Sequence, residues 1–313
     1  MKIALIGYTG FVGSNLMHQY AFTDCYNSKN IQDIHGKQYD LSICAGVRAP
    51  KWIANEQPIK DLNDIQDLMH HLSQAEIKTM VLISTVDVYP DRVNVNEDTV
   101  IDDSRLVPYG FNRRYLEKWV EETYPEHLIV RLPGLLGMGI KKNFIRDILY
   151  PMPMLFNENF MRHIKAEMSP DDYRVIEKHY PKDGVNYRFD QTDEHEVKTI
   201  LDRYKISSLL FTDSEDSFQY YPLMELRKHI ELCLQNKIEV INLVTEPVQA
   251  KEVYHYLYGK SFRNELPRMK QVYDLKTIHA EVLGGKNGYL YNKTEILEII
   301  RKFVMNYQRR DKV

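Results

Sequence analysis

Residues 2–13 read KIALIGYTGFVG, a short apolar run that leads directly into a group of glycines. An apolar run ended by glycine is typical of a strand buried on both faces of a parallel sheet. Gly7, Gly10 and Gly13 would allow a tight turn and let the backbone approach a pyrophosphate where a helix begins, here predicted over residues 11–20. The stretch therefore predicts a dinucleotide site. The alternative is a strand-to-helix turn that needs glycine for its geometry alone.

Candidate strands and helices alternate along the first half of the chain. Apolar runs predict strands at residues 41–45, 80–84 and 128–132, and helical periodicity marks residues 61–72 and 109–123. This alternation favours an α/β fold, a Rossmann-type doubly wound parallel sheet with a smaller C-terminal substrate lobe.

The second half has a different sequence pattern, because Pro151 and Pro153 interrupt the regular elements and a polar stretch follows. We predict a dinucleotide-binding domain over 1–150, completed by 206–250. The remainder of 151–313 would be mostly a substrate-binding lobe with an insertion near 157–205. The further predicted elements are strands at 217–221 and 239–244, a helix at 223–234, and an amphipathic helix at 294–307 with Thr294 as N-cap.

Composition excludes several classes of function. The formal net charge of −3 leaves no basic surplus to neutralise a nucleic acid. The three cysteines are odd in number and widely spaced, which indicates a reducing compartment, and no apolar run is long enough for a signal peptide or a membrane span. We expect a cytoplasmic protein with no membrane partner. We also expect no metal, since His70-His71 and the Glu194-His-Glu196 run have no partner cluster at metal-ligand spacing.

The G-x-x-G-x-x-G spacing, with Thr9 before the second glycine, resembles the extended short-chain dehydrogenase/reductases that act on nucleotide sugars. Four later segments match the family in the same order: ISTVDVY at 83–89, PYG at 108–110, RLPG at 131–134 with KNF at 142–144, and the region 241–252. The resemblance covers most of the chain outside the insertion. It implies that a nicotinamide cofactor contacts Gly7, Thr9, Gly10, Phe11, Val12, Gly13, Ala45, Gly46, Ser84, Tyr109 and Arg113.

The resemblance makes Tyr109 the acid/base, with Thr85 bonded to the same sugar oxygen. Hydride transfer at a carbinol requires a group that removes or supplies the hydroxyl proton, and a phenol can do this. An unperturbed phenol has a pKa near 10, so its anion needs adjacent positive charge. The alternative interpretation of Tyr109 is an aromatic residue that packs on the core where a helix begins.

Two positions depart from the family pattern. Arg113 stands where the family has lysine, so either the guanidinium supplies the positive charge or redox catalysis is weak or lost. Val86 removes the acid of the family's dehydratases, while Asp87 keeps a carboxylate at the place of their base. A full dehydratase is therefore not expected. Asp87 either abstracts a proton beside a keto group or only forms hydrogen bonds at a strand end.

Cofactor preference depends on the residues that follow the second strand. Asn27-Ser28-Lys29 combines a hydroxyl with a cation and suits the 2′-phosphate of NADP better than the ribose of NAD. Asp33 is the counter-argument if that strand ends later, and Arg48 would add positive charge nearby.

The family resemblance also implies a substrate and a pathway. Thr85, Lys142 and Asn143 would bind a nucleoside-diphosphate sugar, in polysaccharide biosynthesis. Tyr115, Leu116 and Trp119 would suit a homodimer interface or else cover the sheet. We predict an NAD(P)-dependent oxidoreductase or epimerase; the alternative is a catalytically weakened NAD(P)-binding sensor or scaffold protein with the same fold.

Overall fold

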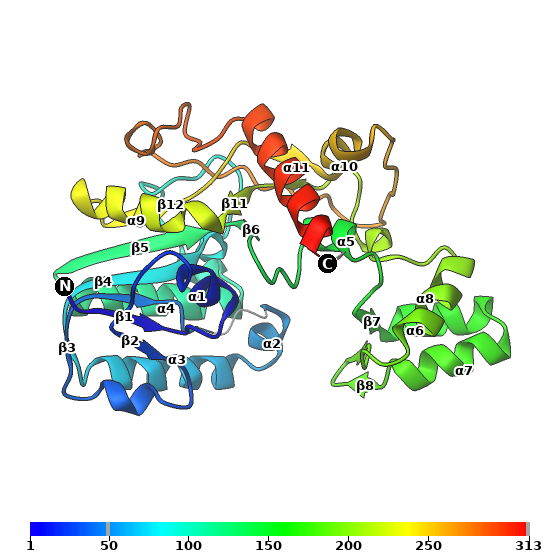
Figure 1. The fold of residues 1–313 in the computed structure, drawn as a ribbon, viewed down its shortest axis with the longest axis horizontal. Helices are drawn as coiled ribbons and strands as arrows, with labels where there is room; N and C mark the ends of the chain where they lie inside the picture. The colour runs from blue at the N-terminus through cyan, green and yellow to red at the C-terminus, as the bar shows by residue number, and fades with distance from the viewer. Residues whose placement is uncertain (48–50, 311–313) are drawn as a thin grey trace. The chain divides into compact units, whose positions relative to one another are not determined.

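The computed structural model describes residues 1–47 and 51–310 (Figure 1). The chain divides into two compact units, each built from three segments. Unit 1 consists of Met1–Ile140, Ser217–Gln249 and Gln271–Arg301, and unit 2 of Lys141–Asp216, Ala250–Lys270 and Lys302–Val313.

Unit 1 is built on a six-stranded sheet in which every neighbouring pair of strands is parallel. The strand order is β12-β5-β4-β3-β1-β2, so the chain leaves β1 on one side for β2 and returns on its other side as β3. This confirms the predicted doubly wound α/β sheet. The strands are β1 (Ile3–Ile6), β2 (Asp24–Tyr26), β3 (Gln38–Cys44), β4 (Glu76–Thr85), β5 (Glu126–Leu132) and β12 (Val240–Asn242).

Helices cover both faces of this sheet, because successive buried side chains on each strand point to opposite sides. One face packs on α1 (Phe11–Leu16) and α9 (Leu226–Gln235), and the other on α3 (Pro58–Leu72) and α4 (Pro108–Thr123) (Figure 1). Strand residues of the first face include Leu5, Ile43, Val81 and Val130; those of the second include Ala4, Ile6, Met80 and Leu82.

Several predicted boundaries were wrong; besides shifts of a few residues at strand and helix ends, the larger differences concern α1, the strand expected at 217–221 and the last helix. Helix α1 ends at Leu16 and not near Tyr20, because the next residues close as turns onto Asn15 and Leu16. The strand expected at 217–221 is two strands, β10 (Ser217–Phe218) and β11 (Tyr220–Pro222), which pair with β13 (Val248–Gln249) and β6 (Gly134–Leu136). Gln219 separates them, since its buried amide donates to the carbonyl groups of Thr245 and Leu275.

The N-cap predicted for the last helix, α11 (Lys293–Arg310), was also wrong. Its cap is Asn292, not Thr294: Asn292 Oδ1 accepts from the Glu295 amide at 3.0 Å, and the Glu295 carboxylate accepts from the Asn292 amide at 2.8 Å. This reciprocal pair satisfies backbone donors that a helix start otherwise leaves unpaired. Thr294 lies inside the first turn and is exposed.

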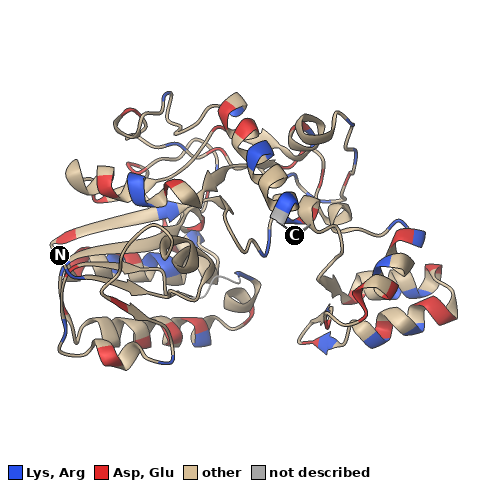
Figure 2. Ribbon diagram, in the orientation of Figure 1, with Lys and Arg blue, Asp and Glu red and all other residues tan. Residues whose placement is uncertain are grey.

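The polar region predicted as an insertion has its own core within unit 2. An antiparallel sheet is accompanied by three helices, and their apolar side chains, among them Phe156, Ile176, Tyr180 and Val197, form one buried cluster. The elements are β7 (Leu155–Asn157), α6 (Glu158–Glu167), α7 (Pro170–His179), β8 (Lys182–Asp183), β9 (Asn186–Arg188) and α8 (Glu194–Arg203). Acidic and basic residues are interspersed over these helices (Figure 2).

The remaining helices are short. They are α2 (Lys51–Glu56), α5 (Phe144–Leu149) and α10 (Ala250–Tyr258), with 3-10 turns η1 (Ile31–Ile34), η2 (Val86–Val88), η3 (Asp103–Arg105), η4 (Ser208–Phe211), η5 (Leu223–Glu225) and η6 (Glu281–Leu283). Among the described residues, no helix combines the length and apolar character that a membrane crossing needs.

Candidate active site

The glycine turn follows β1 at the place where the sheet order reverses. Gly7 has φ +85°, and a Cβ atom there would lie 2.4 Å from the carbonyl oxygen of Ala45. Only glycine therefore lets the chain leave β1 so close to the Ala45-Gly46 segment that follows β3. Thr9 and Gly10 are exposed, whereas Gly13 is buried beneath the turn. Phe11 and Val12 pack partly on the core.

A second group of polar residues gathers where β4 ends. Thr85 is the last residue of β4, Asp87 lies in η2, and Tyr109 begins α4. The Thr85 hydroxyl donates to the Asp87 carboxylate at 3.1 Å, and both side chains lie close enough to the Tyr109 phenol to shift its pKa. Gly110 makes this possible, because a Cβ atom there would lie 2.4 Å from the backbone oxygen of Asp87. Because β1 and β4 are parallel, this group and the glycine turn lie at the same edge of the sheet.

Arg113 lies one turn after Tyr109 and is held by an acid on the neighbouring helix. Its guanidinium carbon is 4.5 Å from the centre of the Tyr109 ring. Nη1 and Nη2 contact the two carboxylate oxygens of Asp61 at 2.6 and 3.1 Å, and the two side chains are only 5% and 10% exposed. The positive charge beside the phenol is thus shared with a buried carboxylate of α3.

Two further cations surround Asp87, whose side chain is 5% exposed. Lys51, the first residue of α2, forms an ion pair with the Asp87 carboxylate, and its ammonium lies 5.7 Å from the centre of the Tyr109 ring. Arg92 Nη2 is 3.4 Å from Asp87 Oδ1, and the Tyr273 hydroxyl donates to the same oxygen at 3.5 Å. No sequence motif marks Lys51, Arg92 or Tyr273 as a site residue, since only the fold brings them to Asp87.

The surroundings of Tyr109 keep it a phenol at neutral pH. Burial raises its pKa above the ordinary value; Arg113 lowers it, the Asp87 carboxylate raises it, and the nearby Thr85 hydroxyl lowers it. Burial outweighs the attraction of the guanidinium. Before a ligand binds, Tyr109 is therefore suited to donating a proton.

Ser84 has a different setting from its neighbour Thr85. Its hydroxyl donates to Glu117 of α4 at 2.6 Å, and Glu117 is fully buried. Arg131 of β5 pairs with the same carboxylate at 2.7 Å and donates to the Tyr89 hydroxyl at 2.6 Å. Through Glu117, this network connects β4 and β5 to α4. Arg131, in the RLPG segment at 131–134, is therefore bonded to a buried carboxylate of the same unit.

The residues predicted to select the cofactor lie where expected relative to β2. This strand ends at Tyr26, and Asn27, Ser28 and Lys29 form a turn in which Asn27 Oδ1 accepts from the Lys29 amide at 2.8 Å. Asp33 lies farther along, in η1. Arg48 falls outside the described residues.

Two predicted substrate residues, Lys142 and Asn143, lie in unit 2, whereas Thr85 and the predicted interface residues lie in unit 1. Asn143 Oδ1 caps α5 by accepting from the Arg146 amide at 3.1 Å. On α4 in unit 1, Leu116 is buried in the core and Trp119 packs against it, whereas Tyr115 is 37% exposed.

Two histidine-containing groups also differ from expectation. The Glu194-His-Glu196 run does have partners: ligand atoms of His179, Asp193 and Glu196 all lie within 4.8 Å of one another. The prediction that this run has no partner at metal-ligand spacing was therefore wrong. His179 was not foreseen as a partner because it precedes the run by more than ten residues in the sequence. His70 and His71 of α3 lie beside His35, whose Nε2 is 2.9 Å from His71 Nδ1.

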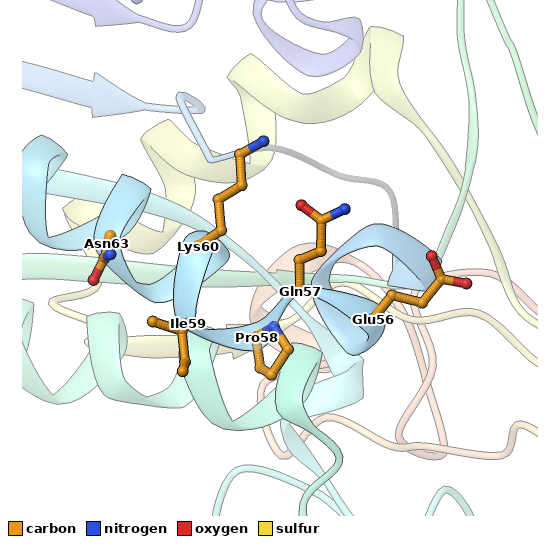
Figure 3. A pocket seen from close by; sticks show the side chains of 6 residues that line it. All are labelled: Glu56, Gln57, Pro58, Ile59, Lys60 and Asn63. Carbon is orange, nitrogen blue, oxygen red and sulfur yellow. The ribbon is translucent and has the colours of Figure 1, made fainter. Parts of the chain in front are cut away.

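A surface hollow of about 440 Å³ lies at the junction of α2 and α3 (Figure 3). It is lined by Glu56, Gln57, Pro58, Ile59, Lys60 and Asn63. Its lining includes neither the glycine turn nor the residues around Tyr109, so it contributes nothing to the acid/base group.

Comparison with solved structures gives many full-length matches. RMD from Pseudomonas aeruginosa complexed with NADPH aligns with a TM-score of 0.62, 13% identity and coverage of 99% of this chain and 100% of that one. The chain shares the fold of nucleotide-sugar enzymes. A UDP-glucose 4-epimerase from Thermotoga maritima, with UDP-glucose, aligns at 0.62 with 14% identity and 99% coverage of both chains. TunA, an NAD-dependent NDP-hexosamine 5,6-dehydratase, aligns at 0.62 with 14% identity and 98% coverage of both. A scan against protein-family models and a search of curated proteins gave no match.

Proposed function

We propose that this chain is an NAD(P)-dependent oxidoreductase or epimerase acting on a nucleoside-diphosphate sugar. The observation that carries the proposal is the group of Thr85, Asp87 and Tyr109, which lies with Arg113 at the sheet edge that also bears the glycine turn. Structures with this fold include a reductase for a dTDP-linked sugar and several UDP-sugar epimerases. Fold similarity alone names no substrate, so the sugar class is part of the proposal.

The residues at this edge fit a nicotinamide dinucleotide. Thr9 and Gly10 are exposed in the turn that follows β1, and no Cβ atom projects from Gly10. Ser28 and Lys29 are exposed at the end of β2, the strand next to β1, and would contact a 2′-phosphate; this favours NADP over NAD. When bound, the nicotinamide would supply or accept the hydride.

The chain's own residues would handle the proton. Tyr109 would donate its phenolic proton to the sugar oxygen in reduction, or take it back in oxidation. Thr85 would hold the same oxygen. Arg113 and Lys51 would stabilise the phenolate that proton donation leaves, and Lys51 would add to the role expected of Arg113 alone. Asp87 would orient Lys51 and Thr85, since its carboxylate contacts both.

Turnover with a panel of UDP-, GDP- and dTDP-sugars and their 4-keto forms tests the proposal; nicotinamide absorbance follows reduction or oxidation, and chromatography of the sugars follows epimerisation. We expect Tyr109→Phe to lower turnover about a hundredfold or more, with NADPH binding within about twofold of wild type. Tyr115→Phe is the matched control, because Tyr115 is a partly exposed tyrosine of the same helix. Normal turnover by Tyr109→Phe would remove Tyr109 from the mechanism.

One observation favours a second candidate function, a nicotinamide-binding sensor or scaffold. The Arg113–Asp61 pair leaves less positive charge for the phenol than an unpaired cation would. A wild-type protein that binds NADPH, leaves its redox state unchanged and converts no sugar of the panel to an epimer would support this candidate and contradict the enzyme.

A further inference from the structure

Unit 2 contains a compact group of potential metal ligands that the proposed activity does not use. His179 is the last residue of α7, and the chain returns after the β8–β9 hairpin to Asp193 and Glu196 at the start of α8. One ligand atom from each of the three residues lies within 4.8 Å of the other two. All three belong to unit 2, so the group does not depend on the position of unit 1.

The orientation of the His179 ring is fixed from one side. Its side chain is 1% exposed, and Nδ1 lies 3.0 Å from Thr192 Oγ1 and 3.3 Å from the Asp190 carboxylate. Asp190 is held in turn, because the amide and hydroxyl of Thr192 both donate to its Oδ1, at 2.8 and 2.7 Å. A ligating histidine commonly has its second nitrogen bonded to a carboxylate in this way.

The other ring nitrogen faces the acidic pair. Nε2 of His179 is buried, forms no hydrogen bond with the described residues, and lies 3.7 Å from Asp193 Oδ2. Leaving a buried polar nitrogen without a hydrogen bond costs free energy. Asp193 precedes α8 but does not cap it through its side chain, so its carboxylate is not committed to the helix. Glu196, three residues later, lies on the same side of the first turn.

We propose that His179 Nε2, Asp193 and Glu196 bind a divalent transition-metal ion, with Zn²⁺ the best fit. One imidazole and two carboxylates form a mixed nitrogen and oxygen ligand set that Zn²⁺ accepts, with a water as fourth ligand. Mg²⁺ fits less well, because it prefers octahedral oxygen ligands. The two carboxylates balance the charge of the ion. The ion would displace the distant contact of Lys178, whose ammonium is 4.0 Å from Asp193 with both side chains exposed.

Calorimetric titration of the chelator-treated full chain with Zn²⁺ tests the site. Asp193→Asn and Glu196→Gln remove ligand charge at exposed positions without touching the core, whereas His179 is buried and is left intact. We expect one tight site in wild type and binding weakened about tenfold or more in each variant. Glu194→Gln is the matched control in the same helical turn and should bind Zn²⁺ like wild type. Mg²⁺ should bind more weakly.

A separate group of histidines in unit 1, made of His35, His70 and His71, provides the competing explanation. If Zn²⁺ binding persists in Asp193→Asn and Glu196→Gln but is lost in His71→Ala, the ion binds beside His35 and the proposal is overturned. Wild-type protein that binds no Zn²⁺ would overturn it as well, and would leave His179 as a buried side chain that contacts Asp190 and Asp193. Circular dichroism of the metal-free variants should match that of wild type, which shows that any lost binding is not lost folding.

Discussion

Arg113 shows that the partner of a charged side chain matters as much as its type. The arginine keeps the charge expected beside Tyr109, but the Asp61 carboxylate receives both of its terminal nitrogens. Lysine could not make this two-pronged contact. Arginine at position 113 is therefore matched by Asp61 of α3. A second cation, Lys51 of α2, also lies near the Tyr109 ring.

The Arg113–Asp61 pair should make a measurable contribution to stability. Removing one partner leaves the other charge buried and alone, which typically costs about 3–5 kcal/mol. We expect Arg113→Gln and Asp61→Asn each to lower the free energy of unfolding by about that amount, and the double variant to lose clearly less than the sum. Urea denaturation of the four proteins measures this. Additive losses would mean that the two side chains do not interact.

His229 should make stability depend on pH. Its ring is 1% exposed and hydrogen-bonded to the Tyr221 hydroxyl at 2.7 Å, and burial lowers its pKa to about 4. Between pH 6.5 and 4 the unfolded chain binds a proton at this residue and the folded chain does not, so the free energy of unfolding falls as pH falls. The loss from this residue should reach about 2 kcal/mol at about pH 5.

Urea denaturation at two pH values tests the role of His229. In His229→Gln the free energy of unfolding should change less between pH 8 and 5 than in wild type. His18→Gln, at an exposed position, is the control and should retain the wild-type slope. Equal slopes for wild type and His229→Gln would contradict the prediction.

At the scale of elements, long-range contacts set where helices and strands end. Gln219 divides one apolar run into β10 and β11, because its side chain bonds backbone groups from two other segments. The sequence pattern predicts an element there but not its division, since period-2 alternation says nothing of which strand is paired.

The start of α11 can be tested by removing its N-cap side chain. Asn292→Ala should lower the free energy of unfolding by about 1 kcal/mol, because it removes the oxygen that accepts from the Glu295 amide. Thr294→Ala should leave it unchanged or raise it slightly, since alanine is the better helix former. Thermal denaturation of the two variants compares them. A larger loss in Thr294→Ala would place the cap at Thr294 after all.

At the scale of the whole molecule, the residues of the proposed function and the buried cluster of unit 2 lie in different compact units. The glycine turn, Thr85 and Tyr109 all belong to unit 1. The segment predicted as an insertion, near 157–205, belongs to unit 2 and has a buried cluster of its own. Changes in that cluster should therefore affect the stability of unit 2 before they affect nucleotide binding at the site proposed in unit 1.

Ile176→Ala tests the separation. Ile176 is fully buried in the unit 2 cluster, and such a truncation typically costs about 2–5 kcal/mol. We expect scanning calorimetry to show an earlier transition, while NADPH binding at 20 °C, measured by fluorescence, stays within about twofold of wild type. NADPH binding lost in proportion to the stability change would contradict independent units.

The sequence by itself determined the α/β class, the glycine turn after β1 and the central strands, because these follow from local periodicity and from what glycine alone can do. It also marked Tyr109 and Thr85 as candidates through a family resemblance. Only the tertiary structure decided which charges meet: Arg113 with Asp61, 52 residues apart, Lys51 and Arg92 with Asp87, and His179 with Asp193 and Glu196. Such pairings depend on how helices and loops pack, and no short-range pattern in the chain specifies them.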